Sequence, residues 1–157
     1  MSKVITSFVG LDVHYDSIAL GVAPVGREPP HFVGTVAPQW VSLCKALSRL
    51  GKREGLQIVY EAGPCGFGIA RRLKQLPVPC LVAAPSLIPK APGSPFKTDK
   101  RDARAIARLL RAGELTAVYI PEPTDEAIRD LCRARTDAVD DLRRCRHRLK
   151  GFLLRHG

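Results

Sequence analysis

Three short apolar runs open the chain, at residues 4–14, 17–23 and 31–37, with glycine, proline and polar residues between them. Runs of this length bounded by turn-forming residues are typical of β-strands. Because each run follows closely on the one before, we expect an antiparallel meander of three strands.

Strand and helix patterns alternate through the middle of the chain. Apolar residues at three- and four-residue steps over 40–50 predict a first helix. Residues 57–61 and 79–84 have the pattern of short buried strands, and residues 66–76 between them that of a second helix. This β-α-β alternation is typical of an α/β fold with a mixed or parallel sheet and helices on its faces.

A proline-rich segment at residues 85–97 predicts an extended loop, since its four prolines exclude a helix or a central strand. Residues 99–112 then have the apolar stripe of a third helix, which Gly113 closes. Residues 115–120 are expected to form a last short strand.

The chain from Thr124 to about Arg155 is one uninterrupted helical pattern of some 32 residues, or about 48 Å of helix. Two heptad positions form a seam with one charged interruption: Ile128, Arg135, Leu142 and Leu149, then Leu131, Ala138, Cys145 and Phe152. We therefore expect an α/β domain at residues 1–122 and a long, projecting, coiled-coil-like helix at 123–157, which pairs in a homo-oligomer (dimer or tetramer). A helix folded back on its own sheet is the alternative.

Length and hydropathy bound these expectations. With 157 residues, 45% of them hydrophobic, the chain fits one globular core. No apolar run approaches the roughly 20 residues of a membrane span, and the N-terminus lacks a signal-peptide pattern, so we expect a cytoplasmic protein. The five cysteines are odd in number and form no C-x-x-C pair, which favours reduced thiols used in packing.

A strong positive charge points to a polyanionic partner, with nucleic acid as the leading candidate. Lys and Arg number 25 against 15 Asp and Glu, for a formal net charge of +10. The candidate phosphate-binding residues lie around the third helix and in the acid-free stretch that begins at Leu142: Lys97, Lys100, Arg101, Arg104, Arg108, Arg143, Arg144, Arg146, Arg148 and Lys150. A merely solvated basic face is the alternative for the C-terminal group.

Four acidic residues stand where the predicted elements converge. Asp12 ends the first strand, Glu61 ends the fourth, and Asp99 and Asp102 begin the third helix. If the first strand is central and the fourth lies beside it, Asp12 and Glu61 are neighbours, while i, i+3 spacing puts the other two on one helical face. Carboxylate oxygens are the ligands that Mg²⁺ and Mn²⁺ prefer. The pattern therefore predicts a divalent-metal site able to act on a phosphodiester.

Each acid also has a purely structural explanation. Asp99 has the position of a helix N-cap, and Asp102 is favoured at N3 by the helix dipole. Asp12 has the position of a turn residue at a strand end. Glu61 has the position of a loop carboxylate. His14, two residues beyond Asp12, either joins the metal site or is an ordinary strand histidine, and we favour the latter.

The glycine-rich segment at residues 63–68 has two interpretations. It either cradles a phosphate at the start of the second helix or supplies the small residues that a strand-to-helix turn needs. The turn is favoured because the segment lacks the Gly-Lys-Ser/Thr ending of a P-loop.

Four motifs follow one another along the chain: Gly10-Leu11-Asp12-Val13-His14, Tyr60-Glu61-Ala62-Gly63-Pro64-Cys65-Gly66-Phe67-Gly68, Ala84-Pro85-Ser86-Leu87-Ile88-Pro89 and Lys97-Thr98-Asp99-Lys100-Arg101-Asp102-Ala103. They resemble the successive motifs of one insertion-sequence transposase family, which has an N-terminal DEDD, RuvC-like domain and is described as bridge-RNA-guided recombinases. The resemblance covers essentially the whole chain, with residues 121–157 corresponding to the helical segment of the family.

The resemblance implies a ribonuclease-H-like (RuvC-like) fold in which Asp12, Glu61, Asp99 and Asp102 are the DEDD set and bind Mg²⁺ or Mn²⁺. It further implies a recombinase that cuts and rejoins DNA during transposition, with DNA and a structured guide RNA as partners.

Two features depart from the family pattern. Tyr15 follows His14 where the family often has lysine. Family members continue into a second domain whose serine is implied to attack DNA, whereas this chain ends at Gly157 and its serines match no such motif. We therefore expect the metal-binding half of a composite active site. A nucleic-acid-binding and dimerisation module without catalytic activity is the alternative.

Overall fold

A computed structural model of the chain describes residues 4–89 and 98–157. The chain divides into two compact units, Met1–Ile120 and Pro121–Gly157. Most of the predicted proline-rich loop lies outside the described residues. Of the part that is described, Pro85–Leu87 forms a 3₁₀ turn with proline at its start, so this short stretch is not extended as predicted.

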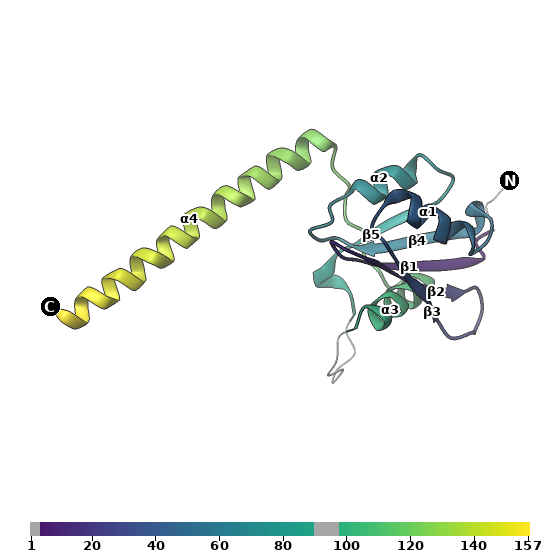
Figure 1. Ribbon diagram of the computed structural model, residues 1–157, viewed down its shortest axis with the longest axis horizontal. Coiled ribbons are helices and arrows are strands. Elements are labelled where there is room, and N and C mark those ends of the chain that lie inside the picture. The colour runs from purple at the N-terminus through teal and green to yellow at the C-terminus, as the bar shows by residue number, and fades with distance from the viewer. Residues whose placement is uncertain (1–3, 90–97) are drawn as a thin grey trace. The chain divides into compact units, whose positions relative to one another are not determined.

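A five-stranded mixed sheet of order β3-β2-β1-β4-β5 forms the centre of the first unit (Figure 1). Its strands are β1 (Ser7–Val13), β2 (Ile18–Pro24), β3 (His31–Val36), β4 (Leu56–Glu61) and β5 (Cys80–Ala83). The first three strands form the predicted antiparallel meander, while β4 pairs with β1 and β5 with β4 in parallel. The α/β prediction is confirmed, and the architecture is that of a ribonuclease-H-like fold.

Three helices cover the two faces of the sheet. The helices α1 (Trp40–Ser48) and α2 (Gly68–Lys74) lie over one face, and α3 (Asp99–Ala112) lies over the other (Figure 1). The larger part of the core forms between the sheet and α1 and α2, around buried side chains such as Leu11, Ile58 and Leu43. Alternation along each strand sends every second side chain to the opposite face, toward α3.

Glycines let α3 approach the sheet closely. Gly10 of β1 and Gly21 of β2 pair with each other in register. A Cβ atom at Gly10 would collide with the carbonyl oxygen of Ala103, and one at Gly21 would collide with the backbone of the same residue. The absence of a Cβ atom at both glycines therefore lets the N-terminal half of α3 pack directly on the backbone of β1 and β2.

The expected strand at residues 115–120 is not a strand. Ala117 forms an isolated antiparallel bridge with Ala83, flanked by a hydrogen bond from Val118 N–H to the Val82 carbonyl at 2.8 Å. The apolar pattern of the segment instead reflects packing against the core, where Val118 and Ile120 are partly buried. Pro121, which lacks an N–H group, follows directly and cannot extend the ladder.

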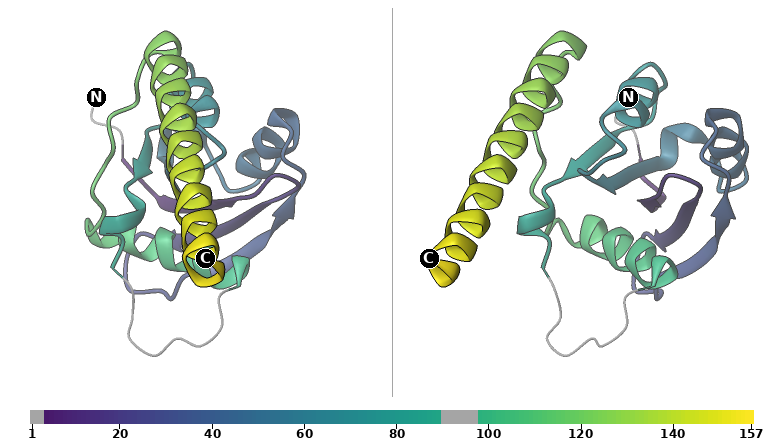
Figure 2. Two further views of the ribbon diagram at one scale, coloured as in Figure 1. Left: turned by 90° about the vertical axis from the view of Figure 1, so that its left-hand side faces the viewer. Right: turned by 60° about the vertical axis from the view of Figure 1, so that its left-hand side comes forward.

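The second unit is a single helix, α4 (Pro123–His156), of 34 residues, or about 51 Å (Figure 2). The predicted uninterrupted helix is confirmed. Its apolar seam positions are solvent-exposed within this unit, with Leu131 72% and Leu149 59% exposed. Whether the helix pairs, and whether the domain boundary lies at residue 122, stay predictions. Among the described residues, no helix is both long enough and apolar enough to cross a membrane.

Candidate metal and nucleic-acid site

The C-terminal ends of the two central parallel strands bring Asp12 and Glu61 side by side. Leu11 of β1 pairs in parallel register with Tyr60 of β4, and both side chains belong to the core under α1 and α2. The next residue of each strand therefore faces the opposite side of the sheet, which α3 covers. The strand order, with β1 beside β4, therefore accounts for the expectation that these two acids are neighbours.

The N-terminus of α3 supplies the other two predicted acids. Thr98 is the N-cap residue and Asp99 and Asp102 lie in the first turn, so the interpretation of Asp99 as the N-cap is wrong. Thr98 makes no side-chain capping hydrogen bond, and its carbonyl oxygen accepts from the N–H groups of Arg101 and Asp102. Negative charge in a first turn is favoured by the helix dipole.

Three side chains converge on one point: Asp12 near the end of β1, His14 one residue beyond that strand, and Asp99 at the start of α3. His14 Nε2 lies 3.1 Å from Asp12 Oδ2 and 3.5 Å from Asp99 Oδ1. One ligand-type atom from each residue lies within 4.8 Å of the others. Asp12 is 20% exposed, whereas His14 and Asp99 are 42% and 58% exposed, so the group is accessible from solvent.

The cluster differs from the predicted set in its membership. It contains Asp12 and Asp99 of the four acids and adds His14, which sequence analysis favoured as an ordinary strand residue. The i, i+2 spacing of Asp12 and His14, which puts both on the α3 side of β1, was the signal for it. Glu61 lies beside Asp12, and Asp102 lies one turn along α3 from Asp99, where it is half-buried.

The donor chemistry fits a divalent cation. Two carboxylates offer hard oxygen atoms of the kind that Mg²⁺ and Mn²⁺ bind, whereas Glu61 and Asp102 do not belong to the cluster that the described residues form. An imidazole nitrogen suits Mn²⁺ better than Mg²⁺, or it orients a ligating carboxylate from outside the coordination sphere.

A pocket of about 660 Å³ opens beside the cluster at the ends of β1 and β4. The turn between β4 and α2 borders it, where Gly66 has φ +63° and accepts a hydrogen bond from the Tyr60 hydroxyl at 3.0 Å. This is the strand-to-helix turn that the glycine-rich segment predicted. The pocket is lined by Asp12, Val13, His14, Tyr15, Ile18, Pro38, Trp40, Leu43, Glu61, Ala62, Gly63, Pro64, Cys65, Gly68, Ile69 and Arg72.

Cys65, the cysteine that lines this pocket, is not activated as a nucleophile or as a metal ligand. Burial raises the pKa of the Cys65 thiol, and burial raises that of Cys80 to about 12. A protonated thiol is a poor nucleophile and a poor metal ligand. These residues and Cys44 are partly buried, as predicted for packing residues, but Cys132 and Cys145 are exposed on α4, so the packing interpretation is wrong for them within that unit.

The basic residues of α3 form an exposed row. Lys100, Arg101, Arg104 and Arg108 are all solvent-exposed, while Lys97 lies outside the described residues. The Lys100 ammonium group lies 5.4 Å from the centroid of the Phe32 ring, and Arg104 Nε donates to the Lys100 carbonyl at 3.1 Å. The row begins at the same helix end as Asp99, so phosphates bound there would lie near the carboxylate cluster.

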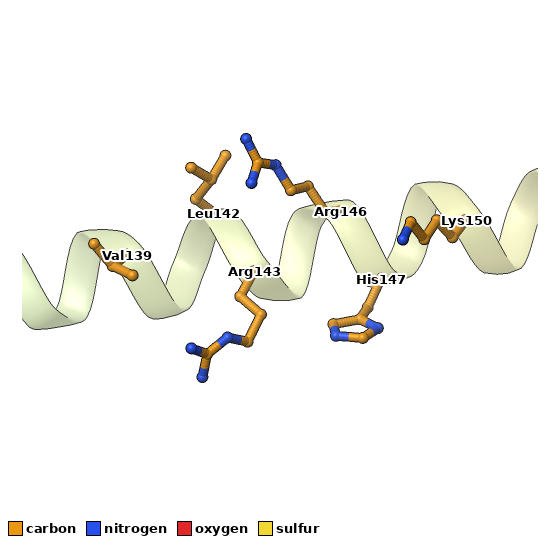
Figure 3. Close-up of a pocket in the computed structure, with 6 residues that line it drawn as sticks. All are labelled: Val139, Leu142, Arg143, Arg146, His147 and Lys150. Atoms are coloured by element: carbon orange, nitrogen blue, oxygen red, sulfur yellow. The ribbon is translucent and has the colours of Figure 1, made fainter.

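The basic residues of α4 do not share one side of the helix. A hollow lies on the surface of this helix, and in Figure 3 Leu142 and Arg146 point to one side while Arg143 and His147 point to the other. The hollow is lined by Val139, Leu142, Arg143, Arg146, His147 and Lys150. Arg144 and Arg148 are offset by about 100° of helical rotation from Arg143 and His147, respectively, and point elsewhere.

Acids one turn earlier on α4 partly offset the positive charge. Arg143 Nη1 lies 3.3 Å from Asp140 Oδ1, and Arg144 Nη1 lies 2.9 Å from Asp141 Oδ1. We call Arg143, Arg146 and Lys150, which line the hollow, the α4 basic face.

Comparison with known proteins identifies the family. The family model DEDD_Tnp_IS110, described as a transposase, matches residues 9–157, so the chain belongs to this transposase family. The chain is 46% identical over 153 residues to the predicted transposase y4qE of Sinorhizobium fredii (strain NBRC 101917 / NGR234), covering 96% of this chain and 39% of that protein. It is 37% identical over 151 residues to the transposase for insertion sequence element IS1533 of Leptospira borgpetersenii, covering 94% of this chain and 43% of that protein. The chain thus spans about two fifths of the length of these relatives.

Proposed function

We propose that this chain is the metal-binding catalytic half of a DNA transposase that cuts and rejoins DNA during insertion-sequence transposition, guided by RNA. The observation that carries the proposal is the convergence of Asp12 on β1 with Asp99 on α3, in a chain of a transposase family. The two residues lie far apart in the sequence. Taken alone, an aspartate at a strand end or at a helix start has a purely structural explanation. Their meeting at one solvent-accessible point favours a binding site.

In this proposal Asp12, Glu61, Asp99 and Asp102 hold Mg²⁺ or Mn²⁺. When bound, such an ion supplies positive charge that polarises a scissile phosphate and stabilises the leaving oxygen. Asp12 and Asp99 present their carboxylate oxygens from two rigid elements, which fixes the site without a long loop. His14 contacts both and holds their orientation.

The basic row of α3 and the basic residues of α4 bind nucleic-acid phosphates in this proposal. Lys100, Arg101, Arg104 and Arg108 extend from the carboxylate end of α3, so they position a phosphodiester rather than read its sequence. On α4, Arg143, Arg144, Arg146, Arg148 and Lys150 bind further phosphates, which increases affinity without sequence preference.

The nucleophile of the reaction lies outside this chain in this proposal. A serine in the part of the relatives that this chain does not cover attacks the DNA. The residues described here bind the metal, orient the phosphate and neutralise its charge. The proposal places the protein in the cytoplasm.

A nucleic-acid-binding and dimerisation module without catalytic activity is the second candidate. The exposed apolar seam of α4 and the basic residues beside it favour this function. The two candidates differ in the role of the carboxylate cluster, because a pure binding module needs no metal there.

Thermal unfolding with and without divalent metal separates the two candidates. An ion that binds the folded chain alone raises the melting temperature. We expect Mg²⁺ or Mn²⁺ to stabilise the wild-type chain and Asp12→Asn to abolish the effect. Asp16→Asn is the matched control, since Asp16 is an exposed aspartate of the β1–β2 turn that accepts a hydrogen bond from Ser17. An equal metal response in both variants would contradict the proposal.

A further inference from the structure

The pocket beside the carboxylate cluster has features that metal binding does not require. Trp40, the first residue of α1, and Arg72 of α2 line the same pocket as Asp12 and Glu61. Both helices lie over the same face of the sheet (Figure 1). An aromatic ring and a guanidinium group therefore line the same pocket as the strand ends that carry two of the acids proposed to hold the metal.

Trp40 combines a fixed position with access to the pocket. Its side chain is half-buried and packs against the main core, which restrains the ring. The guanidinium carbon of Arg72 lies 5.6 Å from the ring centroid, in a cation–π contact. Arg72 is solvent-exposed and lines the pocket, so its charged end is accessible to a phosphate.

Indole rings and guanidinium groups are the side chains on which unpaired nucleobases stack. The volume of about 660 Å³ falls within the range of roughly 300–1,000 Å³ that is typical of small-ligand pockets. Such a pocket has room for a nucleoside. A base that enters it must first leave its stack.

We propose that this pocket binds one unpaired nucleobase next to the reacting phosphodiester, with the base stacked on Trp40 and Arg72 contacting a phosphate. The substrate at this site is then locally single-stranded, and the carboxylate cluster acts beside a base held out of the helix. This inference rests on the proposed function, because the base belongs to the nucleic acid on which the transposase is proposed to act.

The fluorescence of Trp40 reports on the pocket directly, because it is the only tryptophan of the chain. We expect a single-stranded oligothymidylate of about 10 nucleotides, within the site sizes typical of single-strand binding, to quench this fluorescence in EDTA. A thymidylate–adenylate duplex of the same length should quench it far less. Oligouridylate in place of oligothymidylate shows whether DNA or RNA supplies the base. Equal quenching by duplex and single strand, or binding without quenching, would overturn the inference.

A second measurement uses labelled oligonucleotide and does not depend on tryptophan emission. Trp40→Leu, which keeps apolar bulk in the core, should weaken single-strand binding by about fivefold to a hundredfold, and Trp40→Phe should recover most of it. Tyr119→Leu is the matched control, since Tyr119 is 79% exposed and does not line the pocket. Unchanged affinity in folded Trp40→Leu would overturn the inference.

The outcome also separates this inference from the proposed function. Quenching is measured without metal, so a wild-type chain that is quenched but shows no metal-dependent stabilisation supports the nucleobase pocket and contradicts the metal site. A chain with the metal response but without quenching overturns the pocket alone.

Discussion

Nε2 of His14 lies 3.1 Å from Oδ2 of Asp12, two residues earlier on β1. The same nitrogen lies 3.5 Å from Oδ1 of Asp99 at the start of α3. One imidazole thus links the central strand of the sheet to the α3 helix that covers one of its faces. This arrangement makes His14 part of the candidate metal site and gives it a measurable role.

Replacing His14 by alanine should weaken Mn²⁺ binding by about tenfold to a hundredfold, the effect expected when a group that orients a ligating side chain is removed. The measurement is the Kd for Mn²⁺ at constant pH. His31→Ala is the control, because His31 is an exposed histidine at the start of β3. Equal affinity in the His14 and His31 variants would show that His14 is an ordinary strand residue.

Gly10→Ala should lower the free energy of unfolding by about 2 kcal/mol or more, since overpacking of this kind costs roughly 1–3 kcal/mol and here the new methyl group meets backbone. The added Cβ would collide with the Ala103 carbonyl oxygen and press on Ile106 and Ala107. Urea denaturation measures the change. Gly68→Ala, where a Cβ meets nothing within 4 Å, should leave stability nearly unchanged. Similar stability in both variants would mean that α3 does not need this close approach.

Removing the α4 basic face should flatten the salt dependence of nucleic-acid binding. Arg143→Ala, Arg146→Ala and Lys150→Ala together should reduce the slope of log affinity against log salt by about one for each phosphate that the variant no longer binds. The control removes the same charge from exposed residues elsewhere: Arg27, Arg49 and Lys52. If both triple variants have the same slope, the α4 residues act only through net charge.

Charge in the α4 seam should prevent self-association. A stripe of exposed apolar residues on a 34-residue helix is expected to be covered by another copy, so the wild-type chain should form a dimer or tetramer. Leu142→Asp with Leu149→Asp should give a folded monomer in light scattering. Leu154→Asp is the control, because Leu154 is 86% exposed and lies off the seam. A wild-type monomer at tens of micromolar, as an order-of-magnitude test of moderate affinity, would contradict this prediction.

The spacing of apolar residues predicted the fold well wherever one helix or one strand determines that spacing. The meander, the β-α-β alternation and the long C-terminal helix all follow from apolar spacing, and the structure confirms them. The segment around Ala117 shows the limit: its apolar residues pack on the core, but only an isolated bridge forms beside β5. Apolar runs of a few residues indicate burial without distinguishing a strand from a packed connection.

The candidate site was predictable to the extent that topology determined it. The placement of Asp12 beside Glu61 followed from a central first strand, which the sheet order bears out. The convergence with Asp99 and the inclusion of His14 depend on how closely α3 approaches β1, and that distance is determined by Gly10 and Gly21. Small residues at a helix–sheet contact have no period in the sequence, so this part of the site required the structure.

The central claim is that β1 and α3 share one divalent-metal site, and counting bound Mn²⁺ tests it most directly. Electron paramagnetic resonance of free Mn²⁺ gives the number and affinity of bound ions for the wild-type chain, Asp12→Asn and Asp99→Asn. The account predicts that each substitution alone removes the same bound ion, while Asp16→Asn and Glu114→Gln, which change acids away from the cluster, keep it. Wild-type Mn²⁺ binding by folded Asp12→Asn or Asp99→Asn would contradict the account.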